Sequence, residues 1–221
     1  MSSKPEDIRD FFEKRADGYD EHMAESVEDF KAFYAILADP IEKTEGEIAI
    51  LDLGAGTGIE LEYIFAKAPQ ARITAVDLSP RMLSRLLDKY NRYEQQIQTV
   101  EASYLTMELG PYAYDYAVSV MSLHHLLPEE KIHIYAKIRE ALKPAGSYIE
   151  GDYIASEEEE GRLIKEYRKL KEDFVLPEDG LFHIDIPSSE KTQMMTMREA
   201  GFKEIRVLFR TYRSNVIAAS G

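Results

Sequence analysis

Three glycines and two aspartates between residues 52 and 77 are the part of this 221-residue chain best suited to bind a ligand. Gly54, Gly56 and Gly58 follow a short apolar stretch, and Asp77 ends a second one. Glycine has no Cβ and tolerates positive φ, so such a loop lets backbone N–H groups approach a ligand closely. A helix that begins after the loop adds partial positive charge, and an acid at Asp77 suits the two hydroxyls of a ribose. These residues therefore predict a nucleoside pocket at the carboxyl edge of a parallel sheet.

The residues around the loop distinguish two kinds of nucleoside. A dinucleotide site also uses a glycine-rich turn and a ribose acid, but Ile59 stands where that fingerprint has its third glycine. Asp52, just before the loop, would repel a pyrophosphate and would suit a ligand that carries an ammonium group. We therefore favour a nucleoside with an ammonium group over a dinucleotide.

Positioning these residues requires strands that alternate with helices, and the apolar pattern predicts both. The predicted strands span 48–53, 73–76, 97–100, 114–120 and 147–151, with a closing hairpin at 203–209 and 212–219. Helices are predicted at 5–38 (as one or two helices), after the glycine loop, from residue 79, at 128–142, from residue 156, and at 188–200. Such alternation is typical of an α/β fold with a parallel sheet.

Three sequence blocks resemble the signature blocks of class I S-adenosylmethionine-dependent methyltransferases. They read LDLGAGTG at 51–58, VDLSPRML at 76–83 and LKPAG at 142–146, in the family's order and at roughly its spacing. The similarity spans about residues 48–152 and is to the small-molecule type, similar to methyltransferase types 11 and 12. It implies a Rossmann-like α/β fold, with a seven-stranded, mostly parallel sheet, helices on both faces and an antiparallel last strand. It also implies an enzyme that uses S-adenosylmethionine (SAM) and releases S-adenosylhomocysteine (SAH).

The same resemblance implies a single methyltransferase domain over residues 1–221. Its parts would be an N-terminal helical cap (1–45), a cofactor-binding core (46–153), an insertion with cap helices (154–200) and closing strands (201–221). The two cap segments would close over the acceptor site and exclude water from it.

The residues that hold the cofactor in the family can be carried over onto the matching positions. Asp52 would contact the ammonium of SAM, directly or through water, and Asp77 would accept the ribose hydroxyls. Leu78 would pack on the adenine, and Ser103 stands where many members have an aspartate for the adenine amino group. The predicted set is Asp52, Gly54, Ala55, Gly56, Gly58, Asp77, Leu78, Met82, Ala102, Ser103 and Val120.

The acceptor side is expected just beyond the fourth strand, in the segment that carries His124 and His125. In similar methyltransferases this segment faces the acceptor, so His125 is predicted to contact the substrate or to act as a general base. The alternative is a histidine packed at the start of a helix. His124 is interpreted as structural.

Tyr19 is the second candidate catalytic residue, on an N-terminal segment that resembles the lead-in of small-molecule methyltransferases. Its ring would line the pocket and attract the sulfonium, or it would be a core tyrosine that holds the N-terminal helix. Asp152 and Tyr153, which follow the fifth strand, and His183, on the 176–187 loop, are further candidates for substrate contact.

The composition excludes several classes of protein. The formal net charge of −14 argues against a nucleic-acid partner, because neutralising phosphates requires clustered Lys and Arg. The absence of cysteine excludes disulfides and thiolate metal sites and is compatible with the cytoplasm. No stretch approaches the roughly 18 apolar residues of a membrane span, so no membrane partner is expected. No metal site is expected either, because the acidic run 157–160 falls in the first turn of a predicted helix and complements its dipole.

Transfer of a methyl group to the O, N or C atom of a small-molecule substrate is the preferred interpretation. Two alternatives stay open: an RNA or tRNA methyltransferase whose partner supplies a basic surface, and a non-catalytic cofactor-binding module that serves as a regulatory subunit. A dinucleotide oxidoreductase ranks last. The sequence leaves the acceptor and the oligomeric state open, a homodimer included.

Overall fold

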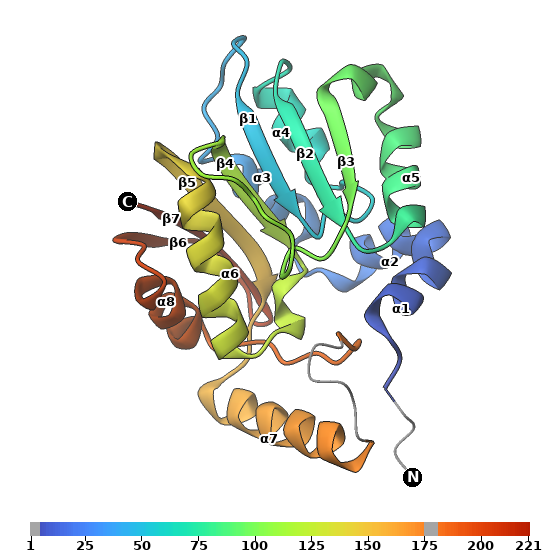
Figure 1. Cartoon of the computed structure of the whole chain (residues 1–221), viewed down its shortest axis with the longest axis vertical. Helices are drawn as coiled ribbons and strands as arrows, with labels where there is room; N and C mark the ends of the chain where they lie inside the picture. Colours follow the sequence, from blue (N-terminus) through green and yellow to red (C-terminus); the bar gives the residue numbers. More distant parts are fainter. Residues whose placement is uncertain (1–4, 175–180) are drawn as a thin grey trace.

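A seven-stranded sheet forms the centre of the computed structural model, which describes residues 5–174 and 181–221 (Figure 1). Within these residues the strands are β1 (Ala49–Leu53), β2 (Arg72–Asp77), β3 (Ile97–Glu101), β4 (Tyr114–Val120), β5 (Leu142–Tyr153), β6 (Glu204–Arg210) and β7 (Ser214–Ser220). Their order across the sheet is β3-β2-β1-β4-β5-β7-β6. Strands β1 to β5 run parallel, and β7 is antiparallel to both of its neighbours. The predicted α/β fold with an antiparallel last strand is confirmed.

The strand order reverses at β1, and this reversal positions the predicted site. The chain runs outward from β1 through β2 to β3, then returns to place β4 on the other side of β1. In open α/β sheets, ligands bind at the carboxyl ends of the strands where the order reverses, because the loops that follow diverge there. The glycine loop follows β1, and His124 and His125 follow β4.

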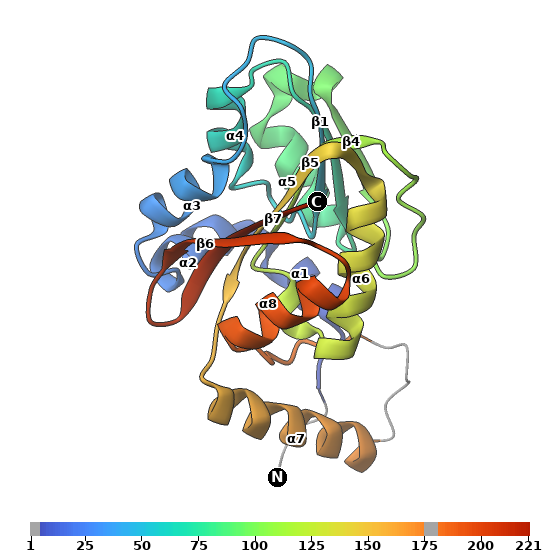
Figure 2. The ribbon, with the colours of Figure 1, turned by 90° about the vertical axis from the view of Figure 1, so that its left-hand side faces the viewer.

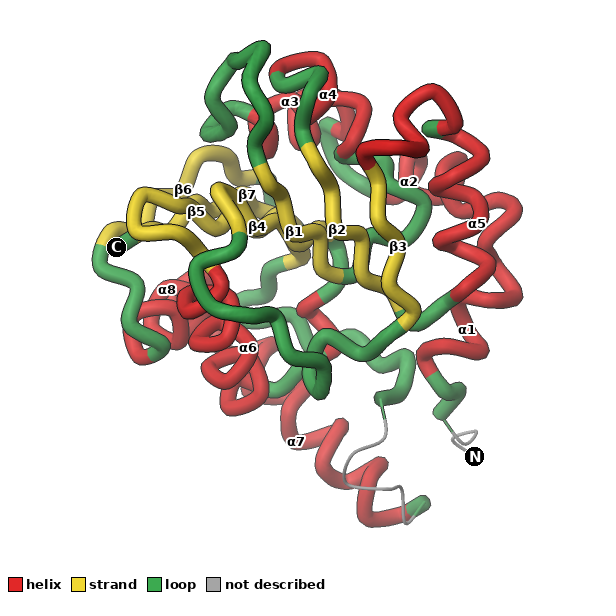
Figure 3. The backbone as a smooth tube through the Cα atoms, turned by 45° about the horizontal axis from the view of Figure 1, so that its top comes forward, coloured by secondary structure: helices red, strands yellow, loops and turns green. Residues whose placement is uncertain are grey.

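Helices cover both faces of the sheet, as a parallel sheet requires (Figures 2 and 3). One face carries α3 (Phe30–Ala38), α4 (Leu61–Lys67) and α5 (Pro80–Lys89), and the other carries α6 (Pro128–Ala141) and α8 (Glu190–Glu199). Successive side chains of a strand point to opposite faces. Ile50 of β1 therefore joins the core under α3 and α4, and Leu51 joins the core under α6.

The N-terminal region forms three short helices, where one or two were expected. These are α1 (Ile8–Arg15), α2 (Tyr19–Ser26) and α3, with the 3-10 turn η1 (Ala16–Gly18) between the first two. Asp29 takes a left-handed φ of 53°, which separates α2 from α3. The Glu13 carboxylate accepts the Ser79 hydroxyl (2.7 Å) and the Arg81 N–H (3.0 Å), so α1 is held at the start of α5. These contacts keep α1 and α2 beside the carboxyl edge of the sheet (Figure 1).

The predicted insertion at 154–200 divides into parts with different positions. Helix α7 (Glu157–Asp173) projects away from the sheet, and α8 packs against α6 (Figure 1). Residues 181–186 return to the carboxyl edge: the Ile8 N–H donates to Leu181 O (3.1 Å) and the Ile186 N–H donates to His124 O (2.8 Å). The part of this insertion that lies over the edge is therefore an extended segment, not a helix. Residues 176–180 of the predicted 176–187 loop lie outside the described residues.

Strand β5 begins earlier than predicted. The expected strand was 147–151, but β5 starts at Leu142, directly after α6. Tyr114 pairs with Leu142 and Tyr116 pairs with Ser147, so a bulge accommodates the intervening residues of β5. Two further 3-10 turns are η2 (Asn91–Gln96) and η3 (Leu123–His125). Among the described residues, no helix is both long enough and apolar enough to cross a lipid bilayer.

Candidate active site

The glycine loop turns sharply after β1 because three of its residues take positive φ. Gly54, Gly56 and Gly58 have φ values of 72°, 52° and 70°, which residues with a Cβ rarely adopt. The N–H groups of Gly54 and Ala55 donate to Val76 O at 2.8 and 3.1 Å. These bonds hold the loop against the end of β2.

Asp77 ends β2 with its carboxylate turned toward the glycine loop. Its Oδ2 accepts the Gly56 N–H (2.9 Å) and its Oδ1 accepts the Ser79 N–H (2.8 Å). Burial raises the pKa of the Asp77 carboxyl, and these backbone N–H groups act in the opposite direction. Each oxygen has a second lone pair, so the carboxylate can still accept two hydroxyl groups.

A narrow cavity lies between the glycine loop and the ends of β2 and β4. Five of the predicted cofactor residues line it: Gly54, Gly56, Asp77, Leu78 and Met82. Six further lining residues were not predicted: Ile8, Phe12, Tyr104, Met121, Ser122 and Leu181. Tyr104 directly follows Ser103, so the predicted segment was correct and the residue that lines the cavity is its next one. Ile8 and Leu181 come from the cap segments, which carry no motif.

Other predicted cofactor residues do not line this cavity. Ala55 and Val120 are packed in the hydrophobic core. A Cβ at Gly58 would meet the side chains of α4 and α5, so this glycine permits close packing. Ala102 and Ser103 precede Tyr104, and the Ser103 hydroxyl accepts a backbone N–H two residues further on (3.3 Å).

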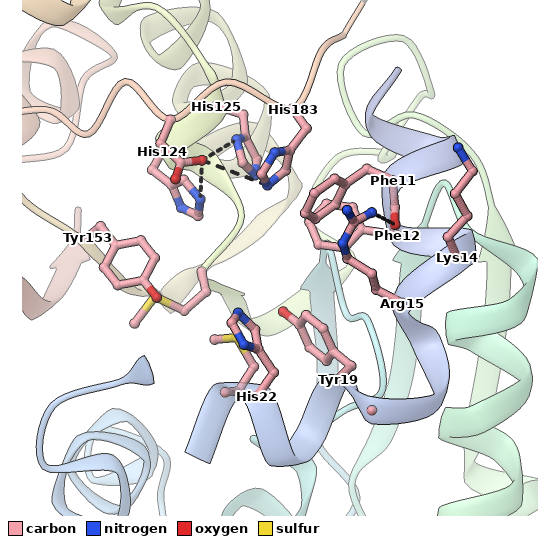
Figure 4. Close-up of a pocket in the computed structure, with 14 residues that line it drawn as sticks. Phe11, Phe12, Lys14, Arg15, Tyr19, His22, His124, His125, Tyr153 and His183 are labelled. Atoms are coloured by element: carbon pink, nitrogen blue, oxygen red, sulfur yellow. Dashed lines mark hydrogen bonds and ion pairs between the residues drawn. The ribbon is translucent and has the colours of Figure 1, made fainter. Parts of the chain in front are cut away.

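A larger cavity of ≈ 600 Å³ adjoins the first (Figure 4). Four residues line both cavities and form the wall between them: Phe12, Tyr19, Met121 and His125. Two other predicted substrate residues, Tyr153 and His183, line the larger cavity. Figure 4 shows the rings of His124, His125 and His183 gathered on one side, with Tyr19 and His22 of α2 across from them.

His124 and Asp152 form a buried pair at the ends of β4 and β5. Nδ1 of His124 lies 2.6 Å from Oδ1 of Asp152, and their side chains are 6% and 1% exposed. Burial alone would lower the pKa of His124, but the Asp152 carboxylate outweighs it, so this pKa is raised. Asp152 itself does not line the larger cavity, whereas His124 does. The predicted substrate residue Asp152 thus orients a histidine that had been interpreted as structural.

His125 has a different environment from its neighbour. Its Nδ1 lies 3.3 Å from Ile184 O, and its buried Nε2 has no hydrogen-bond partner among the described residues. Burial lowers the pKa of His125 well below its usual range, so the ring is neutral near pH 7. Asp185, which was not predicted, lies 3.3 Å from His125 Nδ1. The sequence feature that could have identified Asp185 is its position two residues after His183, a predicted substrate residue.

Tyr19 lies against the glycine loop. A Cβ placed on Gly56 would be 3.6 Å from the Tyr19 ring. Burial raises the pKa of the Tyr19 hydroxyl, and the nearby Asp77 carboxylate raises it further. The hydroxyl therefore stays protonated, which suits a hydrogen-bond donor or a ring contact better than a general base.

Comparisons with known proteins agree with this geometry. A family model described as "Methyltransferase domain" matches residues 50–146. Carboxy-S-adenosyl-L-methionine synthase from Wolinella succinogenes is 25% identical over 217 residues, which cover 91% of this chain and 88% of that protein. Malonyl-[acyl-carrier protein] O-methyltransferase from Priestia megaterium is 33% identical over 104 residues, 47% of this chain and 36% of that protein. Human N-acetylserotonin methyltransferase, solved with SAM, aligns with a TM-score of 0.62 at 18% identity; the match covers 86% of this chain and 52% of the human chain.

The chain carries a methyltransferase domain of the class I SAM-dependent type. SAM is the cofactor of this methyltransferase, and residues at the two ends of the glycine loop fit its ammonium group. Asp52 and Glu60 are buried beside each other and line neither of the two cavities, and apart from each other, Asp52 Oδ1, Asp52 Oδ2 and Glu60 Oε1 have no hydrogen-bond partner among the described residues. Buried polar atoms are normally paired, so an ammonium group would supply the missing donors. The sequence predicted Asp52 for this contact but not Glu60, which lies two residues beyond Gly58.

This carboxyl pair makes the stability of the methyltransferase depend on pH. Burial and the nearby Glu60 raise the pKa of Asp52, and burial raises the pKa of Glu60. The folded state therefore keeps protons that the unfolded chain releases above about pH 4. The free energy of unfolding must fall as pH rises from there through the folded-state pKa values. We expect the Tm of the ligand-free protein to fall between about pH 5 and pH 8, and SAH to raise Tm more at the higher pH.

Thermal unfolding at several pH values, with and without SAH, checks this expectation. Asp52→Asn should flatten the pH profile, because it removes one of the two groups that lose a proton. Glu45→Gln, at an exposed position, is the matched control and should keep the wild-type profile. Parallel profiles for wild type and Asp52→Asn would contradict the expectation.

Proposed function

We propose that this methyltransferase transfers the methyl group of SAM to an oxygen, nitrogen or carbon atom of a small molecule bound in the larger cavity. The observation that supports this proposal is that the two cavities share a wall, which is lined on both sides by Phe12, Tyr19, Met121 and His125. A cofactor in the narrow cavity and an acceptor in the larger one would meet at this wall. An in-line displacement needs such positioning, which supplies much of the rate acceleration. The volume of ≈ 600 Å³ lies within the range of about 300–1,000 Å³ typical of small-molecule sites.

The side chains of the wall support a role in holding the acceptor. Neutral His125 has an unpartnered Nε2, which can take a hydrogen bond or a proton from an acceptor hydroxyl or amine. Tyr19 keeps its hydroxyl proton and presents its ring beside the glycine loop, where a sulfonium is attracted to an aromatic face. The two residues come from different parts of the chain and lie at the same wall between the two cavities.

The cap belongs to the same proposal. Helices α1 and α2 and the extended segment 181–186 would exclude water from the acceptor, as parts of a single domain over residues 1–221. Backbone hydrogen bonds join the two: Ile8 N–H donates to Leu181 O, and His183 N–H donates to Glu6 O (3.0 Å). The two cap segments would therefore move together if the site opens.

Methyl transfer from labelled SAM to a panel of small molecules, with bulk tRNA as a separate acceptor, tests this function. We expect transfer to small molecules. His125→Ala should lower kcat by about tenfold and change the Kd for SAH by less than about twofold. His133→Ala, at an exposed position on α6, is the matched control. Transfer to tRNA alone, or SAH binding without transfer to any acceptor, would overturn the proposal.

A second candidate is the formation of a carboxylated SAM. It is favoured by the alignment with the Wolinella succinogenes synthase, which spans 91% of this chain and 88% of that protein. In that case the methyl carbon would stay on the cofactor, and no SAH would be released. Mass spectrometry of the cofactor after turnover with candidate carboxylate donors distinguishes carboxylated SAM from SAH.

A further inference from the structure

Three imidazole rings and one carboxylate converge at the wall of the larger cavity. Oδ1 of Asp185 lies 3.6 Å from His124 Nε2, 3.3 Å from His125 Nδ1 and 4.0 Å from His183 Nε2. One ligand atom from each of His124, His125 and Asp185 lies within 4.8 Å of the other two. Figure 4 shows the three rings gathered on one side of the cavity, with dashed lines from each that meet at one carboxylate oxygen.

The distances between Asp185 Oδ1 and the histidine nitrogens are closer to those between two ligands of one metal ion than to hydrogen-bond lengths. A charge-assisted N–H···O bond is about 2.7–2.9 Å long. Two ligands that each lie about 2.1 Å from a tetrahedral metal ion are about 3.4 Å from each other. The contacts of Asp185 with His124 and His125, at 3.6 and 3.3 Å, are close to that value.

The surroundings of His124 are those of a metal-binding histidine. Its Nδ1 bonds to the buried Asp152 carboxylate at 2.6 Å, which directs Nε2 toward Asp185. Metal-ligating histidines nearly always give their other ring nitrogen such a carboxylate or carbonyl partner, which fixes the tautomer and the ring orientation. Asp152 is itself anchored, because its Oδ1 also accepts the Tyr153 N–H (2.8 Å). The Ile186 N–H bond to His124 O (2.8 Å) ties the segment that carries Asp185 to the same turn.

We propose that His124 Nε2, His125 Nδ1 and Asp185 Oδ1 bind a divalent first-row transition metal of the Zn²⁺ type. Imidazole and carboxylate donors suit zinc and its neighbours, whereas magnesium and calcium prefer oxygen ligands alone. His183 lies beside these three ligands, with its Nε2 4.0 Å from Asp185 Oδ1, and is not one of them. In the metal-free protein, Nδ1–H of His125 faces Ile184 O and Asp185. When the metal binds Nδ1, the neutral ring carries its proton on Nε2 instead, and the ion rather than His125 then activates the acceptor.

The position of this ion gives it a use in the proposed function, on which this part of the inference rests. Three protein ligands leave a coordination position open, as in catalytic zinc sites. His124, His125 and Asp185 all line the larger cavity, so the open position faces the acceptor. The site therefore takes acceptors with an oxygen or nitrogen atom that can coordinate the ion, and coordination lowers the pKa of that group.

Calorimetric titration of the tag-free, chelator-treated protein with ZnCl₂ alone tests the site without SAM or acceptor. We expect one Zn²⁺ per chain, at least 100-fold weaker binding in Asp185→Asn and His124→Ala, and wild-type binding in the control His133→Ala. Asp185 is 53% exposed on its side chain, so Asp185→Asn should keep the wild-type Tm and separate loss of a ligand from loss of the fold. The chain has no cysteine, so thiolates do not compete for the ion.

Absence of Zn²⁺ uptake by wild type, or equal uptake by wild type and Asp185→Asn, would overturn the metal site. Neither result would contradict the proposed methyl transfer, because the titration contains no cofactor and no acceptor. Conversely, zinc binding with no methyl transfer to any small molecule would overturn the proposed function and keep the metal site.

Discussion

Asp77→Ala should weaken the binding of SAH about 100-fold. Asp77 presents a carboxylate to the narrow cavity with one backbone N–H on each oxygen, from Gly56 and Ser79. Hydrogen bonds from two ribose hydroxyls to such a charged group contribute about 1.5–3 kcal/mol each. Their loss, about 3 kcal/mol in total, corresponds to about two orders of magnitude in Kd. Calorimetric titration with SAH measures the effect directly.

Two companion variants separate the ribose contact from a general disturbance of the loop. Asp77→Asn keeps the side-chain shape and one acceptor oxygen, so its affinity should fall between those of wild type and Asp77→Ala. Glu101→Gln is the matched control, because Glu101 pairs with Asp77 across β2 and β3 but its side chain is 48% exposed. An unchanged SAH affinity in Asp77→Ala would remove the ribose assignment.

Gly54→Ala should both destabilise the fold and impair cofactor binding. A Cβ on Gly54 would lie 2.6 Å from the Cβ of Ser122 and closer still to its hydroxyl, and Gly54 has a φ of 72°. A positive φ costs a residue with a Cβ about 1–2 kcal/mol, and overpacking costs about 1–3 kcal/mol. We expect the free energy of unfolding to fall by about 3 kcal/mol, which lowers Tm by roughly 6–12 °C in a protein of this size. Because the loop must shift away from Ser122, SAH affinity should fall as well.

Gly110→Ala isolates the backbone part of this effect. Gly110 has the same φ of 72°, but nothing lies within 4 Å of the Cβ that it would gain. This variant should lose only about 1–2 kcal/mol and keep wild-type SAH affinity. If denaturant unfolding gives equal losses for the two variants, the contact with Ser122 has no energetic role.

The cofactor half of the site could be predicted from sequence because its signals are local. Glycines with positive φ, an acid at the end of the next strand and a helix cap all lie within one short stretch of chain. The Ser79 hydroxyl accepts the Met82 N–H (3.1 Å) with Pro80 in the first turn, as the residue types predicted. The apolar runs also indicated the parallel strands, since strands buried on both faces are nearly continuously apolar.

Several structural details could not be predicted because they depend on contacts with distant parts of the chain. The break before α3 depends on the left-handed φ of Asp29, a conformation that no nearby residue requires. The early start of β5 depends on pairing with β4, where a bulge accommodates Pro144 and Gly146. Tyr104 lines the cavity in place of Ser103, and the sequence pattern does not show which of two neighbouring side chains faces a cavity.

The amino-acid sequence by itself determined the resemblance to the family, the α/β fold and the expected place of the cofactor, because short-range patterns encode a strand, a tight turn and a helix. Only the tertiary structure decided the acceptor side. His124 meets Asp152, 28 positions away, because parallel strands β4 and β5 end side by side. Asp185 joins them because the segment 181–186 returns to the same edge and bonds to its backbone. Such contacts depend on the packing of whole elements, and no local spacing records them.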